Sequence, residues 1–208
     1  MKVAKIDLAG RTLEQVFEGI APENIACCNW AAEFPYTPKV SFKMFHTGDK
    51  LYVRFDVEEH YTAALVAEDN GQVWTDSCCE FFLAPDDTAY YNIETTCIGK
   101  MLIGYRRKGY EVIHAGADVL SQVERTASLG SEPFAERVGE NKWSLMLGLP
   151  TAVMHQHKIE SWDGLKLKVN LYKCGDKLSK PHFVSWQPIS LPKPMFHCPE
   201  FFTDLELE

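Results

Sequence analysis

The strongest constraint on the fold is a two-residue alternation of apolar and polar side chains, which recurs along the chain in short segments. In LYVRFDV, residues 51–57, the odd-numbered positions are all apolar, while the even-numbered ones are tyrosine, arginine and aspartate. Residues 142–150 and 164–172 show the same alternation. Successive side chains of a β-strand point to opposite faces of its sheet, so this pattern predicts half-buried strands rather than helices.

The rest of the chain extends this pattern. Helices are expected only at 12–20 and 152–159, and turns rich in Gly, Asn and Asp follow one another at short intervals. Many short strands with little helix between them favour an all-β fold, an antiparallel β-sandwich of the immunoglobulin-like or jelly-roll type with one or two short helices. The chain has 208 residues, 46% of them hydrophobic, and no linker or repeat, so we expect a single domain over 1–208. Further strands are expected at 39–46, 77–84, 89–98, 100–106, 110–115, 122–129 and 182–187.

Charge, hydropathy and cysteine content indicate which partners, which cell compartment and which state of the thiols to expect. The net charge of -8 repels phosphate backbones and anionic lipids, which argues against nucleic-acid and membrane-surface partners. With no apolar leader and no long apolar run, we expect a cytoplasmic protein, or a secreted or periplasmic one if a leader has been removed. Four of the seven cysteines form two pairs of sequence neighbours, at 27–28 and 78–79, and adjacent cysteines are poor disulfide partners. We therefore expect all seven thiols to be free.

One predicted strand carries polar residues that an ordinary core strand would not. In VWTDSCCEFFLAP, residues 73–85, the even positions include Trp74, Asp76 and Glu80, and a turn at 84–88 leads into the next strand. An odd number of loop residues places Glu80 opposite Asn92 or Glu94, and an even number places it opposite Ile93. The odd loop is favoured because it gathers the polar side chains on one face and leaves the core face to Phe81, Leu83, Tyr91 and Ile93.

A polar face with aromatic residues at its rim suits a sugar. The C–H face of a pyranose stacks on an aromatic ring, and its hydroxyl groups pair with carboxylates and amides. The alternative is that this face is simply the solvated side of an ordinary sheet.

Four segments in this order carry a resemblance to a known family: VWTDSCCEFFL, YYNIETTCIG, PHFVSW and MFHCPEFFTDLEL. Together with the early stretch CCNWAAEFPYTPKVSFKMFHTGDKLYVRFDV, they resemble the family 9 carbohydrate-binding modules and their stand-alone relatives. The resemblance covers nearly the whole chain. It implies a non-catalytic β-sandwich that holds a glucose- or xylose-type sugar, often at a chain end, between two aromatic rings. It also implies a role in degrading polysaccharides or oligosaccharides such as cellulose or xylan.

The resemblance also implies the ligand-binding residues. Trp74 corresponds to one aromatic of the clamp and Glu80 to an acceptor for sugar hydroxyls. Polar groups are expected at two positions of the following strand, where this chain has Asn92 in place of the family's arginine, and then Glu94. The second aromatic corresponds to Phe196, where characterised members have tryptophan. Trp186 is the alternative second aromatic.

Other interpretations stay open. Glu80 and Glu94 form a carboxylate pair of the type that glycosidases use, although no long insertions build a deep cleft. Asp76, Glu80 and Glu94 are ligands of the type calcium prefers, and relatives in the family carry calcium. Met195 with His197 would be the axial pair of a haem or electron-transfer domain.

A last candidate lies at a basic turn. Arg106 and Arg107 are most simply solvated there, and the alternative is that one of them reaches over the site.

Overall fold

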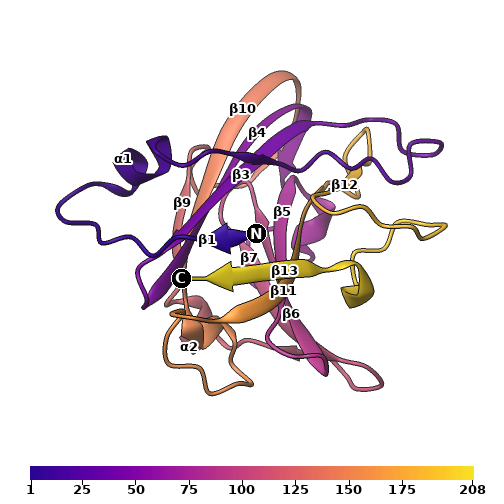
Figure 1. The fold of residues 1–208 in the computed structure, drawn as a ribbon. Coiled ribbons are helices and arrows are strands. Elements are labelled where there is room, and N and C mark those ends of the chain that lie inside the picture. Colours follow the sequence, from indigo (N-terminus) through magenta and orange to yellow (C-terminus); the bar gives the residue numbers. More distant parts are fainter.

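The computed structural model describes all residues 1–208 and contains two β-sheets that face each other (Figure 1). The larger sheet has the order β1 (Lys2–Val3), β13 (Thr203–Leu207), β11 (Lys166–Cys174), β5 (Cys78–Ala84), β6 (Ala89–Thr96), β7 (Met101–Arg107) and β8 (Ile113–His114), with β12 (Phe183–Ser185) also paired to β11. The smaller sheet has the order β2 (Glu23–Asn24), β3 (Lys39–His46), β4 (Lys50–Ala64), β10 (Phe134–Pro150) and β9 (Glu124–Ala127). Apart from the parallel pair β1 and β13, all strand pairs are antiparallel, which confirms the predicted β-sandwich.

Helices are short, as expected. α1 (Leu13–Glu18) begins with a capping box between Thr12 and Gln15, and α2 (Ala117–Leu120) was not predicted. Three 3₁₀ turns complete the elements: η1 (Val73–Thr75), η2 (Thr151–Val153) and η3 (Pro199–Phe201). No helix has the length and apolar character needed to cross a membrane.

The helix expected at 152–159 was a wrong prediction. Only η2 forms there, and two residues after it contact a tertiary partner. The hydroxyl of Tyr91 accepts the backbone N–H of Gln156 at 3.0 Å and lies 2.6 Å from Nδ1 of His157.

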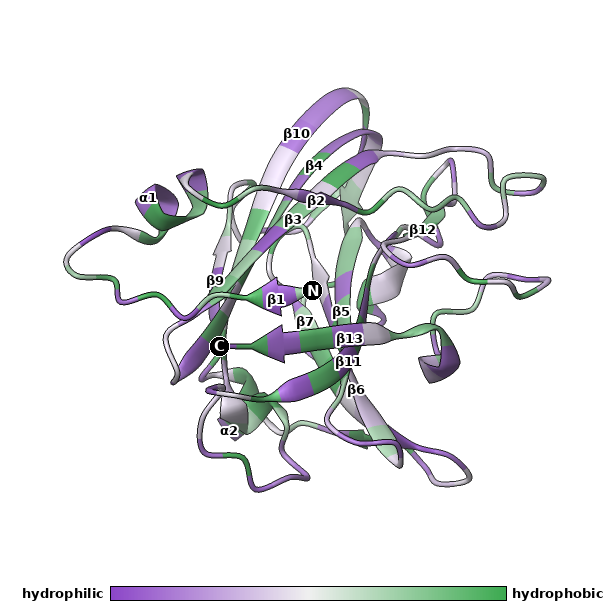
Figure 2. Cartoon of the chain, in the orientation of Figure 1, coloured by the Kyte–Doolittle hydropathy of each residue, from purple (hydrophilic) through white to green (hydrophobic).

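The main core lies between the two sheets. Figure 2 shows the alternation of hydrophilic and hydrophobic residues as purple and green bands along β11 and β13. Phe81, Leu83, Tyr91 and Ile93 belong to a buried cluster of 36 residues, which confirms the predicted core face of β5 and β6. A second, smaller cluster lies on the opposite face of the larger sheet, and it includes Phe82 and Phe196.

Strand register sets which side chains share that opposite face. Glu80 pairs directly with Glu94, so the prediction of an odd loop is confirmed. On the other side of β5, Cys78 pairs with Cys174 of β11. On the other side of β6, Tyr90 pairs with Arg106 of β7.

A buried ion pair connects the sheets. Lys173 of β11 places its Nζ 2.8 Å from Oε2 of Glu59 on β4, and neither side chain has exposed area. Nε1 of Trp143 donates to Oε1 of Glu59 at 2.8 Å, and Nζ of Lys173 donates to Nε2 of His182 at 2.8 Å. Burial and the Lys173 charge hold the pKa of His182 well below its usual value, so this imidazole accepts as a neutral ring.

Candidate functional site

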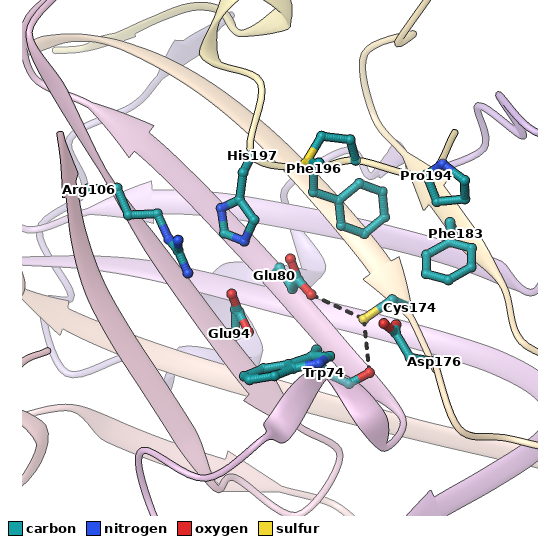
Figure 3. Close-up of a pocket in the computed structure, with 11 residues that line it drawn as sticks. Trp74, Glu80, Glu94, Arg106, Cys174, Asp176, Phe183, Pro194, Phe196 and His197 are labelled. Carbon is teal, nitrogen blue, oxygen red and sulfur yellow. Dashed lines mark hydrogen bonds between the residues drawn. The ribbon is translucent and has the colours of Figure 1, made fainter. Parts of the chain in front are cut away.

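A pocket of about 230 Å³ lies on the outer face of the larger sheet, where β5, β6, β7 and β11 meet η1 and the C-terminal segment (Figure 3). It is lined by Trp74, Glu80, Glu94, Arg106, Cys174, Asp176, Phe183, Pro194, Met195, Phe196 and His197. Four of the six residues expected at a binding site therefore line one cavity, although 122 positions separate Trp74 from Phe196.

Two aromatic side chains lie on different sides of this pocket. Trp74 stands in η1, immediately before β5, and is half-buried. Phe196 is 8% exposed and stacks on Tyr172, with ring centroids 4.2 Å apart and an interplanar angle of 13°. Figure 3 shows Glu80 and Cys174 between these two rings. Because Tyr172 covers one face of Phe196, Trp74 is the aromatic residue with more surface available to a ligand.

The base of the pocket carries two buried carboxyl groups on neighbouring strands. Oε1 of Glu80 accepts the thiol of Cys174 at 3.1 Å, and Oε1 of Glu94 accepts Nδ2 of Asn92 at 2.8 Å. Desolvation and the charge of Glu94 raise the pKa of Glu80 well above its usual value. Desolvation also raises the pKa of Glu94 to about 7. The pair therefore retains a proton near neutral pH and can donate as well as accept hydrogen bonds.

Asn92 supports the pocket rather than lining it. Its Oδ1 accepts Nε of Arg106 at 2.8 Å, while its Nδ2 donates to Glu94, so one amide orients both charged groups. Arg106 lines the pocket, and its other guanidinium N–H groups have no protein partner. The basic turn therefore does reach the site. A guanidinium is present here, but from β7 rather than from the Asn92 position on β6.

Asp176 and His197 complete the polar lining, and sequence reasoning did not select either as a ligand-binding residue. Desolvation raises the pKa of Asp176 to about 6. Burial, followed by the charge of Arg106, lowers the pKa of His197 to about 4, and its Nδ1 lies 3.1 Å from the hydroxyl of Tyr90. Asp176 occupies the turn after β11, but the sequence alone does not show that β11 lies beside β5.

Trp186 and Asp76 lie outside the pocket. The ring of Trp186 packs edge-on against Phe42 in the main core, with centroids 5.3 Å apart, so it does not form the second side of this pocket. Oδ2 of Asp76 accepts the backbone N–H groups of Leu65 and Val66, both at 2.8 Å. Asp76 therefore holds a turn and does not join the two glutamates as a calcium ligand. Calcium binding elsewhere in the chain stays a prediction.

Comparison with known proteins identifies the family to which this chain belongs. A family model described as "Carbohydrate-binding family 9" matches residues 12–207. The chain belongs to carbohydrate-binding family 9. Family 9 is a non-catalytic carbohydrate-binding family, which confirms the resemblance found in the sequence. No match is found among curated proteins.

Solved structures agree with the family assignment. A proposed carbohydrate-binding protein from Bacteroides uniformis is 41% identical, with a TM-score of 0.94 over 100% of this chain and 98% of that chain. A family 9 module from Caldicellulosiruptor kristjanssonii in complex with glucose has a TM-score of 0.58 at 12% identity, over 100% of this chain and 95% of that chain. The structure of a family 9 module from the same organism in complex with cellotriose has a TM-score of 0.57 at 12% identity, over 100% and 93%. At 12% identity, the last two likenesses show a shared fold.

Proposed function

We propose that the pocket between Trp74 and Phe196 binds the ring of a monosaccharide or the terminal ring of an oligosaccharide. The observation that carries this proposal is the composition of the pocket. An accessible indole, two buried carboxyl groups and an unpartnered guanidinium line the same small cavity.

These groups match the two surfaces of a pyranose. The indole of Trp74 offers a flat apolar face for the C–H groups of the ring. Glu80 and Glu94 accept hydrogen bonds from hydroxyl groups, and whichever carboxyl group is protonated also donates. The four free N–H groups of Arg106 supply further donors in a fixed plane.

The size of the pocket favours a single ring. Its volume of about 230 Å³ lies below the roughly 300–1,000 Å³ typical of pockets for drug-sized ligands. An oligosaccharide would therefore enter by its end, with the remaining rings outside.

The relatives suggest the class of sugar. Family 9 modules with the same fold have been solved with glucose and with cellotriose. We therefore propose a glucose- or xylose-type ligand and a role in the degradation of polysaccharides or oligosaccharides of the cellulose or xylan type.

One observation favours a second function, glycoside hydrolysis. Glu80 and Glu94 are direct cross-strand partners, and both have raised pKa values, as a general acid requires. Release of nitrophenol from aryl glucosides and xylosides, lost in Glu80→Gln, would support this second function.

Calorimetric titration with glucose, xylose, cellobiose and xylobiose tests the binding proposal. Aromatic stacking contributes about 0.5–1.5 kcal/mol beyond the burial of apolar area, which is lost as well, so Trp74→Ala should weaken binding of the preferred sugar by roughly tenfold. It should lower the free energy of unfolding by only about 1 kcal/mol, because the backbone carbonyl of Trp74, which accepts the N–H of Asp176, remains.

The matched control is Trp186→Ala. This ring packs on the core, so its removal should cost about 2 kcal/mol or more of stability and leave sugar affinity unchanged. The proposal is wrong if none of the four sugars binds the parent protein, or if Trp74→Ala binds the preferred sugar as tightly as the parent does.

A further inference from the structure

Two thiols and a carboxylate converge beneath the sugar pocket. The ligand atoms of Cys78, Glu80 and Cys174 all lie within 4.8 Å of one another, and all three residues are buried. Antiparallel pairing produces this cluster, because Cys78 on β5 lies directly opposite Cys174 on β11. Glu80 follows Cys78 by two residues and therefore points to the same face.

The donor set is typical of a thiophilic cation. Two cysteine sulfurs and one carboxylate oxygen suit zinc and its chemical relatives, whereas calcium and magnesium prefer oxygen ligands alone. A tetrahedral zinc site separates two sulfurs by about 3.8 Å and a sulfur from an oxygen by about 3.5 Å. The sulfur of Cys174 is already 3.1 Å from Oε1 of Glu80, so small side-chain adjustments would form the site.

We propose that Cys78, Cys174 and Glu80 bind a zinc-class divalent cation at the base of the pocket. Cys174 and Glu80 line the pocket, so a cation reaches them from solvent without opening the sheet. The fourth position faces the pocket and is open to a solvent molecule, and Asp176 also lines the pocket beside Cys174 (Figure 3). The pocket thus gives the cation access from solvent, and β5 and β11 hold the three ligands in place.

Binding exchanges protons for the cation. The buried thiols are protonated in the metal-free protein, and the thiol of Cys174 donates to Glu80. Each thiol releases one proton as its sulfur coordinates the cation, and Glu80 releases its own proton where it carries one. No electron transfer is involved.

The cation and a sugar share Glu80. If the pocket binds sugar as proposed above, a bound cation removes one of the hydroxyl acceptors, and the two ligands compete. This consequence rests on the proposed function, whereas cation binding itself does not.

Cobalt titration of the reduced, chelator-treated protein tests the site without any sugar. Co²⁺ in a site with thiolate ligands gives a sulfur-to-cobalt charge-transfer band in the near ultraviolet and tetrahedral bands in the visible. We expect saturation at one equivalent, with the bands abolished by Zn²⁺ and unaffected by excess Ca²⁺. Native mass spectrometry of the zinc-loaded protein should show one ion per chain.

Variants locate the ion. Cys78→Ala and Cys174→Ala should each lose most of the charge-transfer band. Cys79→Ala is the matched control, because the neighbouring side chain lies in the main core on the other face of the strand and the band should persist. Circular dichroism shows whether each variant folds.

Glu80→Gln provides a variant that keeps the side-chain shape. It should weaken Co²⁺ binding by roughly tenfold or more, since even the outer partners of metal ligands contribute that much. The proposal is overturned if the parent protein gives no charge-transfer band at saturating Co²⁺, or if the band persists in folded Cys78→Ala and Cys174→Ala. A cobalt band without sugar binding would reject only the proposed function, and sugar binding without the band would reject only the cation site.

Discussion

The carboxyl group of Glu94 has no second hydrogen-bond partner, because its Oε2 is buried and unpaired while Oε1 accepts Asn92. Its pKa is raised to about 7, chiefly by desolvation. A carboxyl group with a raised folded-state pKa favours folding fully only below its unfolded pKa, about 4.3. That contribution is lost as the pH rises through about 7.

Glu94→Gln should therefore remove part of the pH dependence of stability. Relative to this variant, the parent protein should lose about 2–3 kcal/mol of unfolding free energy between pH 5 and pH 8, because a pKa difference of one unit corresponds to about 1.4 kcal/mol. Urea unfolding with a chelator present, at both pH values, measures the difference. Glu18→Gln, at an exposed position of α1, is the control. Equal pH dependence in the parent protein and Glu94→Gln would contradict this assignment.

Sequence reasoning at the residue scale located the polar face but not all of its members. Alternation together with the cost of burying polar groups favoured an odd loop, which is observed, but it left Asn92 and Glu94 as equal candidates for the partner of Glu80. Asp176 and Cys174 could not be predicted, since the residues that β11 pairs with β5 lie 84 to 96 positions apart in the sequence. Trp186 was indistinguishable from a ligand-binding aromatic because a single sequence does not show which face of the sandwich a loop covers.

At the scale of elements, β6 and β7 fit together through a glycine. Gly104 lies opposite Asn92, and a Cβ atom there would lie 2.6 Å from Oδ1 of Asn92 and 3.0 Å from Cγ1 of Val112. The missing side chain leaves room for the amide that orients Glu94 and Arg106.

Gly104→Ala should displace Asn92. We expect a loss of about 1–3 kcal/mol in unfolding free energy from overpacking, together with weaker sugar binding. Thermal unfolding and calorimetry measure the two effects. Gly19→Ala is the control, because its nearest contact would be 3.6 Å away. Unchanged stability and affinity in Gly104→Ala would show that Asn92 can move without consequence.

Strands were predicted better than helices. The strand at 39–46 was predicted with its observed bounds, because its pairing with β4 is regular throughout. β4 and β10 extend beyond their predicted ranges, since the pairing continues past two register shifts near Phe134 and Val138 where alternation is lost. The segment 152–159 was predicted as a helix, but only the 3₁₀ turn η2 forms there, and the Tyr91 hydroxyl accepts the N–H of Gln156 and contacts His157.

At the scale of the whole molecule, the two sheets are joined by a buried charge pair as well as by apolar packing. Glu59 and Lys173 belong to different sheets. Burial acts most strongly and lowers the pKa of Lys173, but the charge and hydrogen bond of Glu59, together with Cys79 and Cys174, raise this pKa overall. Lys173 therefore stays charged inside the protein.

Glu59→Gln should destabilise the protein by about 3–5 kcal/mol, because it leaves the Lys173 charge buried without its partner. The double variant Glu59→Gln with Lys173→Met should recover part of that loss, since no charge then remains. Chemical denaturation of the two variants and the parent protein measures this. A double variant less stable than Glu59→Gln alone would indicate that Lys173 contributes mainly through His182 and packing.

The central claim is that this family 9 chain binds a sugar ring in the pocket beside Trp74. A crystal structure of the complex with the sugar that binds most tightly in calorimetry tests it most directly. We expect the ring stacked on the Trp74 indole, with hydroxyl groups within hydrogen-bond distance of Glu80, Glu94 and Arg106. A sugar bound on another face of the sandwich, with this pocket empty, would contradict the account.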